Sequence, residues 1–166
     1  MKFLSDPSPL YRGVIALGVI ALVAACGSTG PGTAGATASP ATSAASGVDL
    51  EQGTAKVMGA TETVLTSPDG LTLYYLTVDT TTAPKCSGTC LSNWPPLLSN
   101  GNPSSMVPLT GALTVVMNAN GDQVAYNGHL LYRFAGDKLK GDAKGEGLQA
   151  FGGLWKVATP VLTVAG

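Results

Sequence analysis

The chain contains little charge and only one histidine. Asp, Glu, Lys and Arg make up 11% of its 166 residues, and the formal net charge is −1. Nucleic-acid-binding domains usually carry a strongly basic surface, so this composition argues against that class. With His129 as the only histidine, a Ser–His–Asp arrangement has no support beyond chance, and a histidine-containing zinc site is short of ligands. We therefore expect no metal and no cofactor.

The chain also has no apolar run of the roughly 20 residues that a membrane-spanning helix needs. The run from Gly13 to Cys26 is shorter, follows Lys2 and Arg12, and is typical of a signal peptide. Its end, Leu22–Cys26, resembles the lipobox of bacterial lipoprotein precursors. The resemblance implies a signal peptide over residues 1–25, a diacylglyceryl group on Cys26, and anchoring of the protein at the extracytoplasmic face of the cell membrane. A short uncleaved anchor is the alternative.

The stretch after Cys26 lacks charge, aromatic residues and any apolar period. Residues 26–47 are rich in Gly, Ala, Ser and Thr, and such a composition cannot bury enough surface to offset the entropy cost of ordering. We expect a flexible linker there and a β-rich domain over residues 48–166. Loss of Lys2, Asp6 and Arg12 with the signal peptide leaves a net charge of −2, which indicates no particular class of partner.

Only three cysteines are present, and a lipid on Cys26 leaves the pair Cys86 and Cys90. Outside the cytoplasm an even remainder indicates a disulfide, here in a short loop that contributes about 2 kcal/mol. Two other roles stay open. A metal site would have to recruit His129, and a redox role would use a spacing that differs from the Cys-x-x-Cys of disulfide oxidoreductases.

Sustained helical periodicity is absent after the signal peptide, whereas an internal repeat is present. The segment Asp69–Asp79 matches Asn127–Asp137 at a constant offset of 58 residues. Matched residues include the pairs Gly70 and Gly128, Tyr74 and Tyr132, and Asp79 and Asp137, and a tryptophan follows each copy, Trp94 and Trp155.

Each copy is predicted to be a β-hairpin. Asp69-Gly70 and Asn127-Gly128 favour the positive φ angles of two-residue hairpin turns, and Asn120-Gly121 gives a further hairpin signal after the run Leu113–Met117. The residues around these turns alternate with period two. The sequence therefore predicts an all-β domain, an antiparallel sheet built from two related hairpin repeats near residues 62–98 and 113–160.

Several motifs resemble one family in the same order along the chain. They are "CSGTCLSNWPPL", "YNGHLLYRF" and "GEGLQAFGGLWKV", together with "LYRFAGD", which fits a Tyr-x-(Phe/Trp/Tyr)-x-x-Asp signature. The family is that of bacterial secreted lipoproteins in which this signature is repeated, and the resemblance spans Glu62–Pro160. It implies a secreted location and a repeat, but no activity. The first copy departs from the signature at Leu76, where the aromatic residue is lacking.

The signature has a structural and a functional interpretation. On a strand, Tyr132 and Phe134 would face the same side and anchor a core, and Asp137 would accept N–H bonds of a turn. The structural interpretation is the favoured one. In the functional interpretation the motif residues form a ligand surface: Tyr74, Asp79, Trp94, Tyr132, Phe134, Asp137 and Trp155.

These observations favour a non-catalytic module that binds an envelope protein or a cell-wall component, in an oligomeric state that the sequence does not indicate. An accessory role in extracytoplasmic redox or metal handling is the alternative, using the cysteine pair, His129, Met106 and Met117. A hydrolase would need two aspartates as an acid and base about 10 Å apart or closer. The alternating charges of residues 136–147 predict a solvated loop.

Overall fold

The computed structural model describes residues 46–166, which form one compact unit. The predicted signal peptide, Cys26 and nearly all of the predicted linker lie outside the described residues. No helix within the described part of the chain is long and apolar enough to cross a membrane. The first strand begins at Ser46, two residues before the expected start of the β-rich domain.

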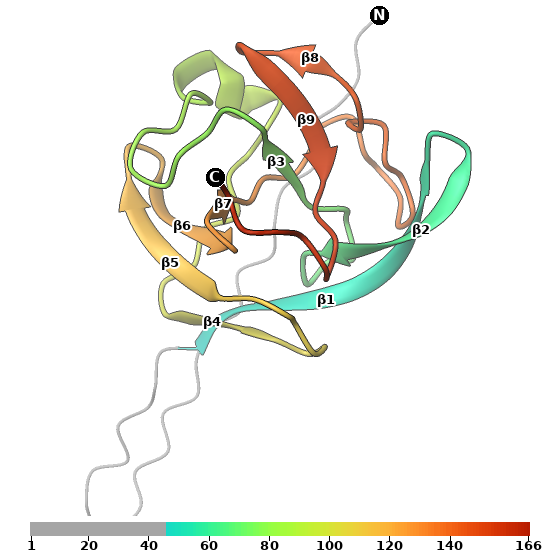
Figure 1. The fold of residues 1–166 in the computed structure, drawn as a ribbon, viewed down its shortest axis with the longest axis horizontal. Coiled ribbons are helices and arrows are strands. Elements are labelled where there is room, and N and C mark those ends of the chain that lie inside the picture. The colour runs from blue at the N-terminus through green and yellow to red at the C-terminus, as the bar shows by residue number, and fades with distance from the viewer. Residues whose placement is uncertain (1–45) are drawn as a thin grey trace, which may run out of the picture. The chain divides into compact units, whose positions relative to one another are not determined.

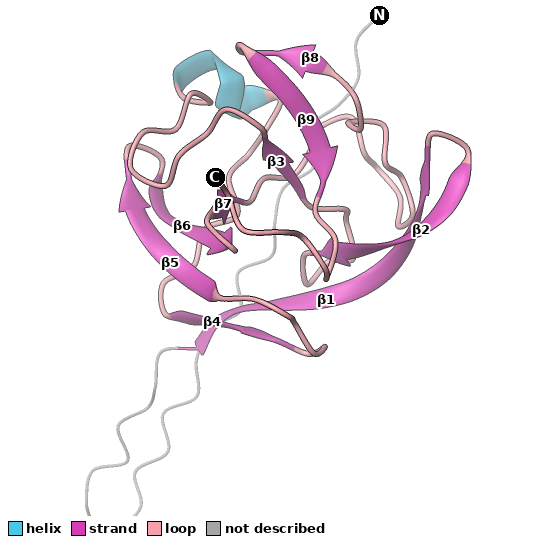
Figure 2. Ribbon diagram, in the orientation of Figure 1, coloured by secondary structure: helices cyan, strands magenta, loops and turns pink. Residues whose placement is uncertain are grey.

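The all-β prediction is confirmed (Figures 1 and 2). Between residues 46 and 166 the chain forms nine strands and one short 3-10 helix, η1. In chain order they are β1 (Ser46–Val57), β2 (Ala60–Thr66), β3 (Tyr74–Leu76), η1 (Gly88–Ser92), β4 (Asn102–Ser105), β5 (Leu113–Asn118), β6 (Gly121–Tyr126), β7 (His129–Leu130), β8 (Gln149–Ala150) and β9 (Gly153–Val157).

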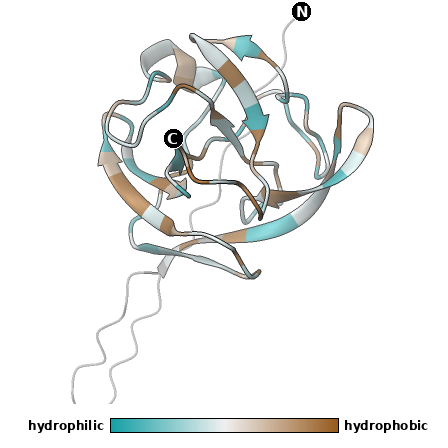
Figure 3. Cartoon of the chain, viewed as in Figure 1, coloured by the Kyte–Doolittle hydropathy of each residue, from teal (hydrophilic) through white to brown (hydrophobic). Residues whose placement is uncertain are grey.

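The strands form three small sheets, in the orders β2-β1-β4, β3-β9-β8 and β5-β6-β7. All pairings are antiparallel except that of β1 with β4, which is parallel. Along the strands, short hydrophobic stretches are interrupted by hydrophilic residues (Figure 3). In β1, for example, Ala55 and Val57 are buried while Lys56 between them is exposed, as expected for a strand with one face against a core.

The turn glycines behave as predicted, but the two turns differ. Gly70 and Gly128 have φ angles of 80° and 82°. Asn127 also has a positive φ, of 49°, so the second copy has the two-residue turn expected for Asn-Gly. In the first copy the prediction of a two-residue turn is wrong. The Ser67 N–H donates to the Leu71 carbonyl and the Gly70 N–H to the Ser67 carbonyl, which encloses a three-residue loop.

The physical reason for the difference is Pro68. Its fixed φ suits the first corner of a type I turn, after which a glycine takes the left-handed conformation. The extra loop residue also shifts the repeat offset. It is 58 residues after the turn, between Tyr74 and Tyr132, but 59 before it, between Leu65 and Val124.

The two repeats make equivalent backbone hydrogen bonds. Leu73 donates to Leu65 at 2.9 Å in the first repeat, and Leu131 donates to Val124 at 2.9 Å in the second. Further equivalent pairs cross between the repeats: Leu65 to Ala158 and Val124 to Leu97, both 2.8 Å, and Ala158 to Leu73 and Leu97 to Leu131, 2.8 and 2.9 Å. The domain therefore has an approximate internal two-fold symmetry, with strands of one repeat completing the other.

The interior has two apolar clusters, because successive residues on the central strands point to opposite sides. One contains Leu73 and Leu131 with other aliphatic residues, and the other contains Tyr74 and Tyr132 with both tryptophans and the cysteine pair. The second cluster therefore collects most of the residues that the sequence singles out as candidates.

Candidate functional site

Tyr74 and Tyr132 meet at the centre of the domain. The N–H of Tyr74 donates to the carbonyl of Tyr132 at 2.8 Å, and the reverse bond is 2.9 Å. Both side chains are fully buried. This reciprocal antiparallel bridge joins β3 of the first repeat to the residues after β7 in the second. The predicted equivalence of the two tyrosines is thus confirmed.

Each tyrosine hydroxyl donates to the aspartate of the other repeat. The Tyr74 hydroxyl lies 2.6 Å from Oδ2 of Asp137, and the Tyr132 hydroxyl lies 2.7 Å from Oδ2 of Asp79. The partners are 63 and 53 residues apart in the chain. Hydrogen bonds to an ionised acceptor are the stronger kind, so these two bonds tie the repeats together in the interior.

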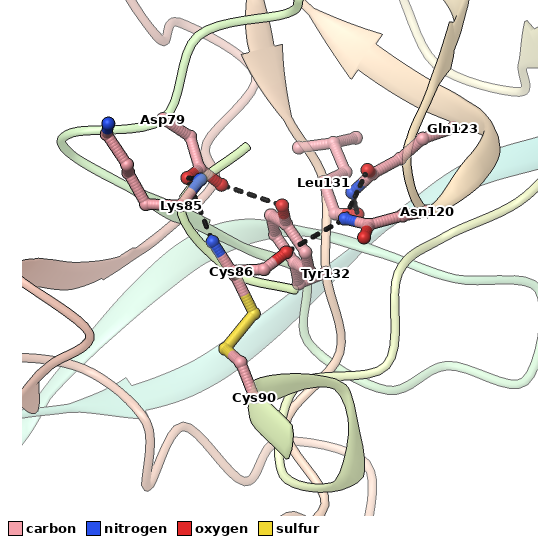
Figure 4. The surroundings of a disulfide bond; sticks show 8 residues. All are labelled: Asp79, Lys85, Cys86, Cys90, Asn120, Gln123, Leu131 and Tyr132. Carbon is pink, nitrogen blue, oxygen red and sulfur yellow. Dashed lines mark hydrogen bonds between the residues drawn. A yellow bond between two sulfur atoms is a disulfide. The ribbon is translucent and has the colours of Figure 1, made fainter. Parts of the chain in front are cut away.

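The second oxygen of each carboxylate holds a loop of its own repeat. Asp79 Oδ1 accepts the N–H groups of Lys85, at 2.6 Å, and of Cys86, at 3.3 Å (Figure 4). Asp137 Oδ1 accepts the N–H of Lys144 at 3.0 Å. Both carboxylates therefore have acceptor sites filled by the protein itself, and each fixes the loop that leads back to the tryptophan of its repeat.

Burial controls the electrostatics of this cluster. Desolvation, and then the bond to an aspartate, raises the pKa of both Tyr74 and Tyr132 well above the usual range. The tyrosines are therefore neutral donors at physiological pH. Desolvation also raises the pKa of Asp79, against the opposing effects of the Tyr132 hydroxyl and the two backbone N–H groups. The hydroxyls are thus suited to holding carboxylates in place.

The two tryptophans stack on each other between the repeats. The Trp94 and Trp155 rings are parallel within 2°, with centroids 3.7 Å apart. Each also meets the tyrosine of its own repeat edge-on, at 5.5 Å for Trp94 with Tyr74 and 5.2 Å for Trp155 with Tyr132. The aromatic stack therefore follows the same internal symmetry as the Tyr–Asp bonds.

The departure at Leu76 has a clear structural counterpart. Leu76 is buried in the core and pairs with Trp155 in the β3–β9 ladder. The equivalent Phe134 is only partly buried, and its ring lies 4.4 Å from the Trp94 ring. Phe134 also lines a surface hollow of about 220 Å³ together with Arg133 and Lys138. The aromatic position is thus internal in one repeat and at the surface in the other.

The seven candidate ligand residues are brought together, but mostly in the interior. Tyr74, Tyr132, Trp94, Trp155, Asp79 and Asp137 are buried. Their contacts fit the structural interpretation of the signature, and a ligand surface that uses them remains a prediction, with the partly buried Phe134 as its least buried member.

The predicted disulfide between Cys86 and Cys90 is confirmed. Both cysteines are fully buried, and Cys90 lies in η1. Figure 4 shows how the second repeat supports this loop: the side-chain amide of Asn120 donates to the Cys86 carbonyl at 2.9 Å. The disulfide therefore closes the loop that Asp79 holds, because the Asp79 carboxylate accepts both the Cys86 N–H and the Tyr132 hydroxyl.

The other residues considered for redox or metal work lie at separate places. The His129 ring contacts the Tyr75 ring, with centroids 4.4 Å apart, and one of its nitrogens lies 3.1 Å from the Thr163 carbonyl. Met106 and Met117 are exposed. Among residues 46–166 there is no group of three or more His, Cys, Asp or Glu side chains that could hold a metal ion.

Sequence reasoning missed two polar residues that support the site. Gln123 is fully buried, and its amide donates to the Leu131 carbonyl at 3.0 Å. The sequence predicts only a turn at Asn120, yet its side chain reaches the disulfide loop. The only sequence signal for such a role is the place of Gln123 directly before the apolar residues 124–126 of β6.

Comparison with known proteins gives one family match, within the second repeat. A family model described as a secreted repeat of unknown function matches residues 114–159, which include most of β5, the second signature and Trp155. No curated protein and no solved structure shows a significant match. The family expected from the motifs is therefore the one whose model matches, and residues 114–159 are similar to this secreted repeat of unknown function.

Proposed function

We propose that the mature protein is a lipid-anchored module on the extracytoplasmic face of the membrane, and that it binds an envelope component without catalysing a reaction. The lipobox-like stretch that ends at Cys26 and the uncharged linker behind it support the anchor. The match to a secreted repeat agrees with a location outside the cytoplasm.

The observation that carries the binding role is the use of the signature residues inside the fold. Tyr74, Tyr132, Asp79 and Asp137 are buried and bonded to one another across the repeats. Groups that most often act as acids, bases or nucleophiles are therefore committed to holding two repeats together. What the domain then offers to other molecules is its surface.

The hollow beside Phe134 is the part of this surface that belongs to the signature. It is lined by Leu71 of the first hairpin, by Pro95, which follows Trp94 in the chain, and by Arg133. The Arg133 guanidinium makes a single ion pair, 3.4 Å from Asp69, and its Nε–H is buried without an acceptor in the described part of the chain. An aromatic ring beside a guanidinium whose hydrogen-bond donors are only partly paired is a common composition for a recognition site.

Two measurements test the proposal. For the anchor, Cys26→Ser should leave an unprocessed precursor that takes up no radioactive palmitate, whereas undiminished labelling would contradict it. For binding, the lipidated protein should capture a partner from native membranes, identified by mass spectrometry. Arg133→Gln should lose that partner and Lys85→Gln, a matched change of an exposed cation elsewhere, should keep it. Turnover of an envelope substrate by the purified protein would contradict the non-catalytic role.

A further inference from the structure

In the loop 136–147 the acidic and the basic side chains differ in how far they are exposed to solvent. In the sequence, acidic and basic residues alternate along it, which predicts an evenly solvated loop. In the structure the acidic side chains are much less exposed than the lysines. Asp137 is 3% exposed, and the side chains of Asp142 and Glu146 are 17% and 9% exposed. The lysines of the loop face solvent.

Backbone N–H groups hold the acidic side chains in place. Asp142 accepts the N–H groups of Lys138 and Leu139 at 2.9 and 3.1 Å. Glu146 accepts the Val157 N–H at 2.6 Å. Bonds to carboxylates of this kind are strong, so the loop has a defined shape and the lysines a fixed direction.

The result is a basic patch that surrounds an exposed leucine. Lys138 and Lys140 flank Leu139, which is 70% exposed. Lys56 of β1 joins them, because its N–H donates to the Gly141 carbonyl at 3.1 Å. Its side chain and that of Lys144 line one hollow of about 270 Å³. The basic patch is defined as Lys56, Lys138, Leu139, Lys140 and Lys144.

Nearby carboxylates only partly offset this charge. Asp142 pairs with Lys144 at 2.8 Å, so that lysine is largely compensated. Glu62 is exposed and lies opposite Ala55 in the β1–β2 ladder, and Glu51 lines a hollow that Lys140 shares. Both glutamates belong to the sheet beside the patch, whereas the loop exposes mainly its lysines and the leucine, with Asp142 partly exposed beside Lys144.

We propose that the basic patch docks onto anionic lipid headgroups of the membrane that carries the anchor. This inference rests on the proposed lipid anchor. Lysines attract the surface of a membrane with anionic lipids, and an apolar side chain among them can enter the headgroup boundary. A soluble polyanion would satisfy Lys138 and Lys140 but would leave Leu139 without a role, so the lipid surface fits the patch better.

The length of the linker permits this contact. Residues 27–45 number 19, and a chain extends at most about 3.5 Å per residue, so they can span roughly 65 Å. The strand from Ser46 to Lys56 rises only about 33 Å. The tether also keeps the patch at a high local concentration near the bilayer. The diacylglyceryl group already retains the protein, so the patch would set the orientation of the domain on the membrane.

A fluorescence measurement tests the docking. Leu139→Cys in the lipidated full-length protein adds the only free thiol, because Cys26 would carry lipid and the other two cysteines are bonded. An environment-sensitive dye on this thiol should shift to the blue and brighten at least two-fold in vesicles with roughly one-third phosphatidylglycerol, compared with phosphatidylcholine alone. High salt should reverse the change.

Matched controls separate docking from labelling effects. The same dye on Met117→Cys, at an exposed position of β5, should not respond to lipid charge. Adding Lys138→Gln and Lys140→Gln should abolish the response at Leu139, and Lys85→Gln should not. A label at Leu139 that ignores lipid charge would overturn the docking. So would a response in neutral vesicles to added soluble polyphosphate alone, which would assign the patch to a polymer.

Flotation with neutral vesicles distinguishes a failure of the docking from a failure of the lipid anchor. Protein that floats with neutral vesicles but shows no dye response would leave the anchor standing and refute the docking. Protein that does not float with them would refute the anchor, and the membrane docking that depends on it would fall too.

Discussion

Tyr74 donates its hydroxyl to Asp137, 63 residues away, and not to Asp79, the aspartate of its own signature. The reciprocal bond runs from Tyr132 to Asp79. One repeat alone would leave its tyrosine hydroxyl and its carboxylate buried without these partners, which is costly. The folding unit is therefore a pair of repeats, although residues 114–159 alone match the family model.

Double-mutant cycles should detect this crossed pairing. Tyr74→Phe should lower the free energy of unfolding by about 2 kcal/mol, because the Asp137 carboxylate loses the hydrogen bond that the tyrosine hydroxyl donates to it. Combined with Asp137→Asn, the two changes should show a coupling energy of about 1–2 kcal/mol in urea titrations. Combined with Asp79→Asn, coupling should be within about 0.5 kcal/mol of zero. The opposite order of coupling energies would show that each repeat is bonded internally.

The tryptophan stack should give a strong near-ultraviolet circular dichroism signal, because the two rings lie parallel in contact. Trp94→Phe or Trp155→Phe should each remove the coupled component, and each should lower the free energy of unfolding by about 1 kcal/mol through the stack alone. The spectra of the two variants, added together, should therefore fall short of the native one. Additive spectra would mean that the rings are not stacked.

The Cys86–Cys90 disulfide should resist reduction while the domain is folded, because both sulfurs are buried. The unreduced protein should weigh about 2 Da less than its dithiol form, and a mild reductant should expose alkylatable thiols only in denaturant. Replacing both cysteines by serine should lower the free energy of unfolding by about 2 kcal/mol or more. Rapid alkylation of two thiols in the native protein would argue for a redox role.

The contributions of Asp79 and Asp142 to stability should change in opposite directions as pH rises. Burial raises the pKa of Asp79, so its contribution to stability is greatest below its unfolded pKa of 3.8 and falls as pH rises through the raised value. The stability advantage of the native protein over Asp79→Asn should therefore shrink as pH rises from about 4. Chemical denaturation of both proteins across this range measures it.

Asp142 provides the comparison. The Lys144 ammonium, followed by the N–H groups of Lys138 and Leu139, lowers its pKa to about 2. Its contribution is present above 3.8 and is lost as pH falls toward 2. The advantage over Asp142→Asn should therefore grow as pH rises between about 2 and 4. If both stability advantages changed in the same direction with pH, the electrostatic description of the two aspartates would be contradicted.

Several features were readable from the sequence because they depend on neighbours in the chain. Asn-Gly and alternating residues specify hairpins through local backbone preference, as at Asn127-Gly128. The constant offset of 58 residues identified the repeat, and the spacing of Cys86 and Cys90 in an oxidising context indicated their disulfide. The sequence pattern does not predict strand β1, because its Asp, Glu and Gly residues have little β propensity.

The tertiary structure alone decided which partners these residues take. Tyr74 could have bonded Asp79 or Asp137, and only the bridge between β3 and the second repeat sets the choice. The exposure of each charge in the loop 136–147 likewise depends on N–H groups of the loop itself and of Val157 in β9, which is 11 residues from Glu146, because folding brings them to the carboxylates. Sequence sets local conformation through φ preferences and side-chain alternation, whereas contacts between segments more than 50 residues apart follow from the packing of the whole domain.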